Sequence, residues 1–302
     1  MHIEIATPQG WAVGEYALLD SGEGYKLERF GGVTLARPDP QAIWPRRQPP
    51  PLWEAADATF NRDSEADEMT GRGTRWVAAR SLPEAWPVHW RNLTMLARLT
   101  PFKHTGIFPE QAAHWDWLTE RIRAVPGRQI RLLNLFGYTG LASLVAAEAG
   151  AQVTHVDASP KALEWARANQ VQSGLADAPI RWLVDDAVKF VRREARRASY
   201  YDVIVLDPPA FGRGAKGEVW KFETSLPGLL ADCRAILTER PLGIILNSYT
   251  IRASSLLLCN LLEAMMAGHR VAGEITVGEL ALPEVGSERL LSTAIYARWT
   301  SR

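Results

Sequence analysis

The sequence predicts an α/β protein in which a twisted, mostly parallel sheet carries helices on both faces, next to a smaller β-rich N-terminal domain. From about residue 112, short apolar runs alternate with segments of helical periodicity, and this alternation is typical of parallel strands joined by helical crossovers. Before about residue 100, short strand-like runs are separated by clusters of glycine and proline. We therefore expect a β-rich domain over residues 1–102 and an α/β domain over residues 103–302.

The N-terminal domain is expected to consist of short strands and turns. Trp11–Leu19 and Val33–Ala36 have the composition of strands. Proline lacks an amide donor, so Arg46–Pro51 should lie outside helices and strands. Turns are predicted where glycine, proline and small polar residues cluster, at Asp20–Gly24, Gly31–Gly32 and Arg37–Pro40.

The α/β domain is expected to open with a helix at Ala112–Val125 and then to alternate regularly. Strands are predicted at Ile130–Phe136, Val153–Val156, Ile180–Val184, Val203–Leu206 and Leu242–Leu246. Helices are predicted at Leu141–Ala149, Pro160–Ser173, Ala187–Arg197, Ser225–Leu237 and Ala253–Ala267. No helix separates Val271–Val277 from Leu291–Trp299, so these two strands should form an antiparallel pair at one edge of the sheet.

Composition limits the classes of function. The formal net charge is zero and neither half of the chain is basic, whereas a general nucleic-acid binder usually is. Arginines are close together in sequence between residues 72 and 98, where they form either a local basic patch or a solvated face: Arg72, Arg75, Arg80, Arg91 and Arg98.

Location follows from what the sequence lacks. No apolar run approaches the roughly 20 residues that a membrane span needs, and the first ten residues do not have the pattern of a secretory signal. The two cysteines, Cys233 and Cys259, lie in apolar segments with helical character. We expect buried, reduced thiols and a cytoplasmic protein.

Two candidate ligand sites follow the first two strands of the α/β domain. Gly137 and Gly140 lie where a strand passes into a helix, and glycine there permits close backbone approach to a ligand near free helix amides. Asp157 ends the second strand, where a carboxylate can accept hydrogen bonds from both hydroxyls of a ribose. Asp157 is available for this role because Ser159-Pro160 supplies a better cap for the next helix.

The third strand is followed by two adjacent acids. Asp185 or Asp186 can accept a hydrogen bond from an adenine amine, and we favour Asp186. Capping of the helix that follows is the alternative, and with two aspartates both roles can be filled.

The fourth strand ends in the most specific motif of the chain. It reads Asp207-Pro208-Pro209-Ala210-Phe211, at the edge where open α/β sheets bind their ligands. The prolines remove amide donors and restrict the path of the turn. Asp207 and backbone carbonyls are then available to accept hydrogen bonds from an amine, and Phe211 can stack on a planar base.

Together these motifs resemble those of class I S-adenosylmethionine-dependent methyltransferases, and more narrowly the bacterial large-subunit ribosomal RNA methyltransferases. The matching segments are Asn134–Gly140, Val156–Leu163, Asp185–Ala187, Asp207–Pro209 and, ahead of them, Lys103–Gln111. The resemblance covers about residues 103–250. The N-terminal domain does not match the RNA-binding module of that family, and it could present substrate, cover the cofactor or mediate dimerisation.

The resemblance implies a Rossmann-like methyltransferase sheet, S-adenosylmethionine as the cofactor and RNA as the partner. It implies that the cofactor contacts Asn134, Phe136, Gly137, Tyr138, Thr139, Gly140, Asp157, Ala158, Ser159, Asp185, Asp186, Ala187 and Asp207. The catalytic residues would be Asp207, Pro208, Pro209 and Phe211. We expect no metal and no membrane partner, and either a monomer or a homodimer.

The inference about the acceptor atom depends on the absence of a cysteine from the expected site. Methylation of cytosine C5 needs a cysteine thiolate that first adds to the ring, and family members with that activity carry it after the fifth strand or near the Asp-Pro-Pro turn. Neither place holds a cysteine here, so we expect a nitrogen acceptor. Arg213, Lys216 and Lys221 could contact a phosphate or carboxylate of the substrate or belong to a solvated loop, and Tyr138 and Tyr249 could line the site or pack.

Three other functions remain open. The neutral charge is compatible with methylation of a small molecule or a protein side chain. A nicotinamide-dependent oxidoreductase could use a similar sheet, although the third glycine of its phosphate-binding turn is missing and the Asp207-Pro-Pro turn argues against it. A non-catalytic module that retains the cofactor fold is the third.

Overall fold

The computed structural model describes residues 2–61, 75–213, 217–249 and 253–302. The chain forms two compact units. Unit 1 comprises Met1–Ala6, Ala113–Leu280 and Thr293–Arg302, and unit 2 comprises Thr7–Ala112 and Ala281–Ser292. Within the described residues, none of the helices is long and apolar enough to cross a membrane.

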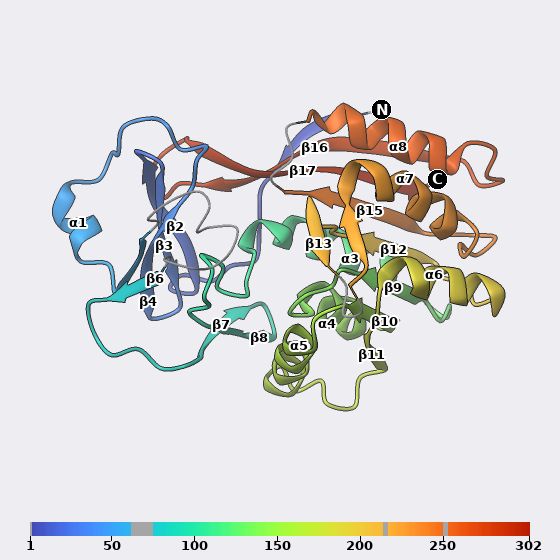
Figure 1. Ribbon diagram of the computed structural model, residues 1–302, viewed down its shortest axis with the longest axis horizontal. Coiled ribbons are helices and arrows are strands. Elements are labelled where there is room, and N and C mark those ends of the chain that lie inside the picture. Colours follow the sequence, from blue (N-terminus) through green and yellow to red (C-terminus); the bar gives the residue numbers. More distant parts are fainter. Residues whose placement is uncertain (1, 62–74, 214–216, 250–252) are drawn as a thin grey trace. The chain divides into compact units, whose positions relative to one another are not determined.

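Unit 1 is built on an eight-stranded sheet with the order β1-β16-β17-β15-β12-β9-β10-β11 (Figure 1). Its strands are β1 (His2–Ala6), β9 (Arg131–Leu135), β10 (Gln152–Asp157), β11 (Ile180–Val184), β12 (Val203–Leu206), β15 (Gly243–Ser248), β16 (Gly273–Pro283) and β17 (Leu290–Ser301). Strands β9, β10, β11, β12 and β15 pair in parallel, and β17 is antiparallel to β15. The Rossmann-like α/β fold expected from the sequence is thus confirmed.

Helices alternate with these strands as the periodicity predicts, with ends that shift by a few residues. They are α3 (Ala112–Arg123), α4 (Leu141–Glu148), α5 (Pro160–Gln172), α6 (Ala187–Arg196), α7 (Phe222–Arg234) and α8 (Ser255–Met266).

Alternation of side chains along each strand builds a separate core on each face of the sheet. In β12, Ile204 and Leu206 join a cluster with residues of α6, α7 and α8. Val203 and Val205 face the other way, into a cluster with residues of α3 and α4. Because the helices cover both faces, side chains can reach solvent mainly from the strand ends. The carboxyl ends of the five parallel strands meet at one edge, which is where ligands bind in such sheets.

The edge of the sheet beside β16 differs from the expectation. We expected the last two strands to form this edge, whereas β1 lies outside them and pairs in parallel with β16. Gly278 faces Glu4 in this pairing, and a Cβ at Gly278 would lie 1.7 Å from the Glu4 carbonyl oxygen. The Glu4 carboxylate is bound by Arg298 and by the Tyr296 hydroxyl. The addition of β1 therefore requires glycine at position 278.

Unit 2 holds a five-stranded sheet of order β2-β3-β4-β5-β6 and a separate hairpin β7-β8. Its described strands are β2 (Tyr16–Gly22), β3 (Tyr25–Phe30), β4 (Val33–Pro38), β5 (Ala58–Asn61), β6 (Arg75–Ala78), β7 (Trp86–Trp90) and β8 (Leu93–Ala97), and its described residues also form the short helices α1 (Pro50–Glu54) and η1 (Pro109–Gln111).

Four expectations for unit 2 were wrong in detail. Arg46–Pro51 was expected to lie outside helices, but α1 begins at Pro50, because prolines in the first helical turn lose no intrahelical hydrogen bond. Trp11–Leu19 was expected to be one strand, but β2 begins only at Tyr16. Two predicted turns, Asp20–Gly24 and Arg37–Pro40, begin inside β2 and β4.

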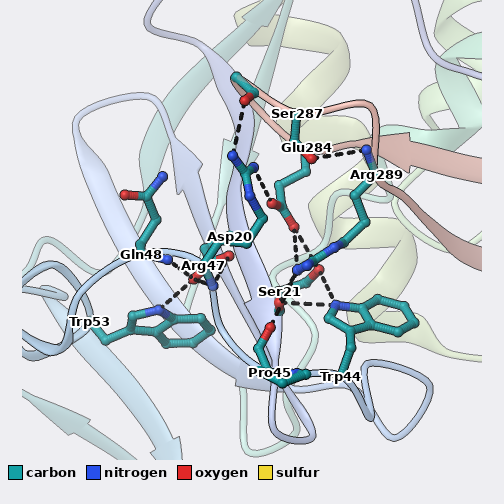
Figure 2. Close-up of polar contacts among 11 residues, drawn as sticks. Asp20, Ser21, Trp44, Pro45, Arg47, Gln48, Trp53, Glu284, Ser287 and Arg289 are labelled. Atoms are coloured by element: carbon teal, nitrogen blue, oxygen red, sulfur yellow. Dashed lines mark hydrogen bonds and ion pairs between the residues drawn. The ribbon is translucent and has the colours of Figure 1, made fainter.

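Buried polar contacts explain why β2 continues through its polar residues. Asp20 is fully buried and accepts hydrogen bonds from the Trp53 indole at 2.8 Å and from the backbone N–H of Gln48 at 2.9 Å. Figure 2 shows Glu284, from the tip of β16–β17, between Arg47 and Arg289. These contacts join the 281–292 segment to the rest of unit 2.

Two histidines are buried in unit 1. His155, on β10, and His114, on α3, have almost no exposed surface. Burial disfavours the charged imidazolium and lowers the pKa of each to about 3. For His114 the positive charge of Arg298 contributes to this decrease of the pKa, and the hydrogen bond with Asn247 opposes it. Both rings are therefore neutral at physiological pH.

We predict that Gly278→Ala displaces β1. Overpacking of this kind costs about 1–3 kcal/mol, because the new methyl group would clash with the Glu4 carbonyl oxygen. Urea denaturation should show lower stability, and hydrogen exchange should become faster at residues 2–6. Gly32→Ala is the control, since a Cβ there meets nothing within 4 Å. Equal effects of the two substitutions would contradict the prediction.

We also predict an unusual acid sensitivity of unit 1. In the unfolded chain, His114 and His155 each bind a proton below about pH 6.5. In the folded chain they bind it only near pH 3. Stability should therefore fall as the pH decreases from 6.5 toward 3, by up to about 1.4 kcal/mol per pH unit for each histidine. Urea titrations at several pH values measure this slope. His155→Asn should reduce it, and an unchanged slope in that variant would refute the assignment.

Candidate functional site

The turn after β9 is held in an uncommon backbone conformation at the carboxyl edge of the sheet. Phe136 and Tyr138 have positive φ angles of 57° and 50°, and Gly140, with φ 82°, caps α4. A Cβ at Gly137 would lie 2.3 Å from Cε1 of His155, and one at Gly140 would lie 2.8 Å from the Trp182 ring. The glycines are therefore required by close packing on the two rings beneath them.

A buried network supports this turn from inside the sheet. The Asn134 amide donates to the Ser143 hydroxyl at 2.9 Å, and that hydroxyl lies 3.0 Å from Nδ1 of His155. The His155 ring contacts the Trp182 ring with centroids 4.6 Å apart. The Asn134 side chain thus points under the turn. Sequence reasoning missed His155 and Trp182, although a histidine within an apolar strand was a visible signal.

Thr139 and Asp157 connect the turn to its neighbours. The buried Thr139 accepts a hydrogen bond at its carbonyl from the Asn169 amide of α5. One oxygen of Asp157 accepts the Tyr138 amide at 2.9 Å and the other accepts the Ser159 amide at 2.8 Å. Burial raises the pKa of Asp157, and the two amides oppose this rise. Asp157 thereby joins the turns that follow β9 and β10.

The helix after β10 is capped as the sequence indicated. The Ser159 hydroxyl accepts the Ala162 amide at 3.2 Å, and Pro160 occupies the first turn of α5. Ala158 lies between the cap and Asp157, half-buried. Asp157 is therefore not needed as the cap of α5.

The two acids after β11 have different partners. Asp186 caps α6 and accepts the Lys189 amide at 2.8 Å. Asp185 accepts the Asp186 amide at 2.9 Å and forms an ion pair with Arg193. Ala187 is the buried first residue of α6. The contact of Asp186 with adenine stays a prediction, and the capping role that was its alternative is present.

The Asp207-Pro-Pro turn is fixed by a tryptophan that the sequence analysis did not single out. The indole of Trp220 donates to the Pro209 carbonyl at 2.7 Å, and its ring packs on Phe136 at 4.9 Å between centroids. Asp207 is half-buried and Pro208 is buried. The turn after β12 is thus attached to the turn after β9.

A two-stranded hairpin follows this turn, with β13 (Phe211–Arg213) paired to β14 (Val219–Lys221). Trp220 is buried, whereas Phe211 is 53% exposed and lies opposite the exposed Lys221 in register. Lys216, like Arg72, falls outside the described residues, and so does the side chain of Arg213. Among its described side chains, the hairpin therefore exposes the Phe211 ring and the Lys221 cation on paired positions.

The remaining candidate residues lie away from this edge or pack inside it. Cys233 and Cys259 are buried in α7 and α8, and burial raises the pKa of both thiols. Tyr249 packs against Leu280, Ala294 and Tyr296. Tyr138 is half-buried, and burial raises its pKa to about 12. Both cysteines are therefore protonated core residues.

Known proteins are similar to this chain in sequence and in fold. A family model described as S-adenosylmethionine-dependent methyltransferase matches residues 59–240, which is more than half of the chain. A solved S-adenosylmethionine-dependent methyltransferase from Agrobacterium tumefaciens is 43% identical, with a TM-score of 0.90 over 99% of this chain and 96% of that one. A methyltransferase structure solved with SAH, SMU.776, is 17% identical with a TM-score of 0.72 over 95% and 76% of the two chains, a likeness of fold alone.

Curated relatives match part of the chain. A ribosomal RNA large subunit methyltransferase K/L of Shewanella sp. (strain ANA-3) is 35% identical over 40% of this chain and 16% of its own length. A ribosomal RNA large subunit methyltransferase I of Shewanella denitrificans is 41% identical over 30% of this chain and 23% of its own length. With the family model and the fold in agreement, the chain belongs to the S-adenosylmethionine-dependent methyltransferases, and S-adenosylmethionine is its cofactor.

Proposed function

We propose that this enzyme methylates a nitrogen of an RNA base, with ribosomal RNA as the favoured acceptor. The observation that carries the proposal is the Asp207-Pro-Pro turn, which Trp220 attaches to the cofactor-side turn and which is followed by the exposed ring of Phe211.

The residues at the first three strand ends fit the cofactor. Each carboxylate oxygen of Asp157 accepts one backbone amide and has a further lone pair for a ribose hydroxyl. The turn from Phe136 to Gly140 precedes the N-terminus of α4, whose amides favour a ligand carboxylate. Asp185 or, by preference, Asp186 would accept a hydrogen bond from the adenine amine. When bound, S-adenosylmethionine supplies an electrophilic methyl group on its sulfonium.

On the acceptor side, residues of the chain hold and orient the nucleophile. Asp207 and the carbonyl groups of the turn would accept hydrogen bonds from an amine, and Phe211 would stack on the base that carries it. Lys221, which is exposed and lies opposite Phe211 in the hairpin, would contact a neighbouring phosphate.

The positions of the thiols support a nitrogen acceptor. A C5 mechanism needs a cysteine at the reacting edge, but both cysteines of the chain are core residues of α7 and α8. Ser248, at the end of β15, is buried, and an alcohol is a weak nucleophile without a base to activate it.

The two curated relatives are named for ribosomal RNA methylation, and this supports RNA as the class of acceptor, with action in the cytoplasm. The zero net charge keeps a small molecule or a protein side chain as the second candidate. Transfer of labelled methyl from the cofactor to separated RNA, protein and small-molecule fractions distinguishes them. Label in RNA is the expected result, and label in protein alone would rule RNA out.

The roles of the two aspartates can be separated. Asp157→Ala should weaken cofactor binding about tenfold to a hundredfold, because a charge-assisted hydrogen bond contributes about 1.5–3 kcal/mol. Asp207→Ala should leave binding unchanged and slow transfer about 100-fold or more. Calorimetry with S-adenosylmethionine and methyl-transfer rates measure both, with the exposed Asp177→Ala as the control. The reverse pattern would show that the roles are exchanged.

The thiols can be tested directly. Cys233→Ser and Cys259→Ser should each retain methyl transfer within about twofold, with some loss of stability from burying a hydroxyl. Rates are compared at saturating cofactor, and circular dichroism checks folding. A folded serine variant that has lost transfer would overturn the nitrogen-acceptor assignment.

A further inference from the structure

A second polar side chain lies beside Asp207 at the carboxyl edge of the sheet. Strand β12 pairs with β15 up to Leu206 and Leu246, so Asp207 and Asn247 occupy the next position in register. Neighbouring strands are about 4.8 Å apart. Leu206 and Leu246 both face the core with α7 and α8, and alternation along β15 therefore directs Asn247 to the opposite face, toward α3. Asp207 follows directly after the last residue of β12.

One residue of α3 contacts Asn247. The Nε2 atom of His114 lies 2.7 Å from the Asn247 Oδ1, and both side chains are buried. The imidazole is neutral, as shown above, and an amide oxygen only accepts, so Nε2 carries the hydrogen and donates it. This hydrogen bond sets the orientation of the Asn247 amide, because the oxygen end is held by His114.

The histidine is itself held from the other side. Its ring packs edge-on against Tyr296, with centroids 4.9 Å apart, and the Tyr296 hydroxyl donates to Glu4. Arg298 contacts the same carboxylate and lies over the Tyr296 ring. His114 therefore has one fixed orientation.

We propose that His114 is a positioning residue for methyl transfer: through its hydrogen bond it orients the amide of Asn247, near the carboxyl end of β15, and this amide in turn holds the Asp207-Pro-Pro turn of the neighbouring strand β12 in its reactive geometry. The proposal rests on the proposed acceptor-side role of Asp207. A misplacement of about 1 Å can slow a reaction about 100-fold, so the pair acts on the rate of transfer and leaves cofactor affinity unchanged.

The test compares variants that keep or lose the donor. In His114→Phe the ring remains and the donor is lost, whereas His114→Gln keeps an amide N–H that can reach Asn247. Single-turnover rates are measured at saturating S-adenosylmethionine on whichever fraction the wild-type enzyme labels, together with the dissociation constant for S-adenosylmethionine by calorimetry. We expect His114→Phe to be slower about tenfold to a hundredfold, with cofactor affinity within twofold, and His114→Gln to recover most of the rate.

A double variant separates positioning from stability. His114→Phe leaves a buried amide without its donor, which destabilises the fold. His114→Phe/Asn247→Leu replaces both polar partners with apolar ones, which can be nearly neutral for stability, so it should fold and bind cofactor but remain slow. The control is His269→Phe, a half-buried histidine near Trp299 at the opposite edge of the sheet, which should transfer at the wild-type rate.

Three results would overturn the proposal: a wild-type rate in His114→Phe, a His114→Gln variant as slow as His114→Phe, or a loss that follows cofactor affinity. Label in protein instead of RNA would refute the RNA acceptor while the variant comparison still decides the role of His114.

Discussion

The site depends first on the packing of the β9 turn against His155 and Trp182. Where a side chain would project from Gly137 or Gly140, these rings already occupy the space. The turn is thereby held low over the sheet, where the Gly137 amide donates to the Val156 carbonyl and the Gly140 amide to the Gly137 carbonyl. Asp157 then connects this turn to the next strand through two backbone amides. The neutrality of His155 matters here, since an imidazolium under the turn would be an uncompensated buried charge.

Each later part of the site is attached to this turn. Trp220 packs on Phe136 and binds the Pro209 carbonyl, so the acceptor-side turn takes its position from the cofactor-side turn. In a direct displacement the reacting atoms must align, and most of the protein's contribution is this alignment. Packed rings and a short hydrogen bond contribute to it here.

Much of the fold could be predicted from sequence because periodicity is a local signal. Strands such as Ile180–Val184 and the cap at Ser159-Pro160 are determined by neighbouring residues, and the structure has them in place. The cofactor and the family followed from motifs at four strand ends. Strand β1 was missed since its five residues gain their pairing from Gly278, far away in the chain. Asp20 was assigned to a turn because its partners, Gln48 and Trp53, are distant in sequence.

The site residues that were missed share one property. His114, His155, Trp182 and Trp220 act through contacts with backbone or amide groups on other elements, and sequence spacing does not record such contacts. The ring of Trp220 is recognisable only once the hairpin brings it to Pro209. By contrast, Asp157 and Asp207 end their strands, and a strand end can be located from sequence alone.

The course of β16 and β17 has a consequence for dissecting the protein. Their tip, residues 281–292, belongs to unit 2 and is held there by Arg47 and Ser21 through Glu284. Unit 2 is thus assembled from two separated stretches of chain, and unit 1 from three. A fragment cut at a single point in the sequence would expose the buried carboxylate of Glu284 or leave the edge of the large sheet without β1. An exchange of unit 2 between related enzymes would therefore have to include residues 281–292 together with residues 7–112.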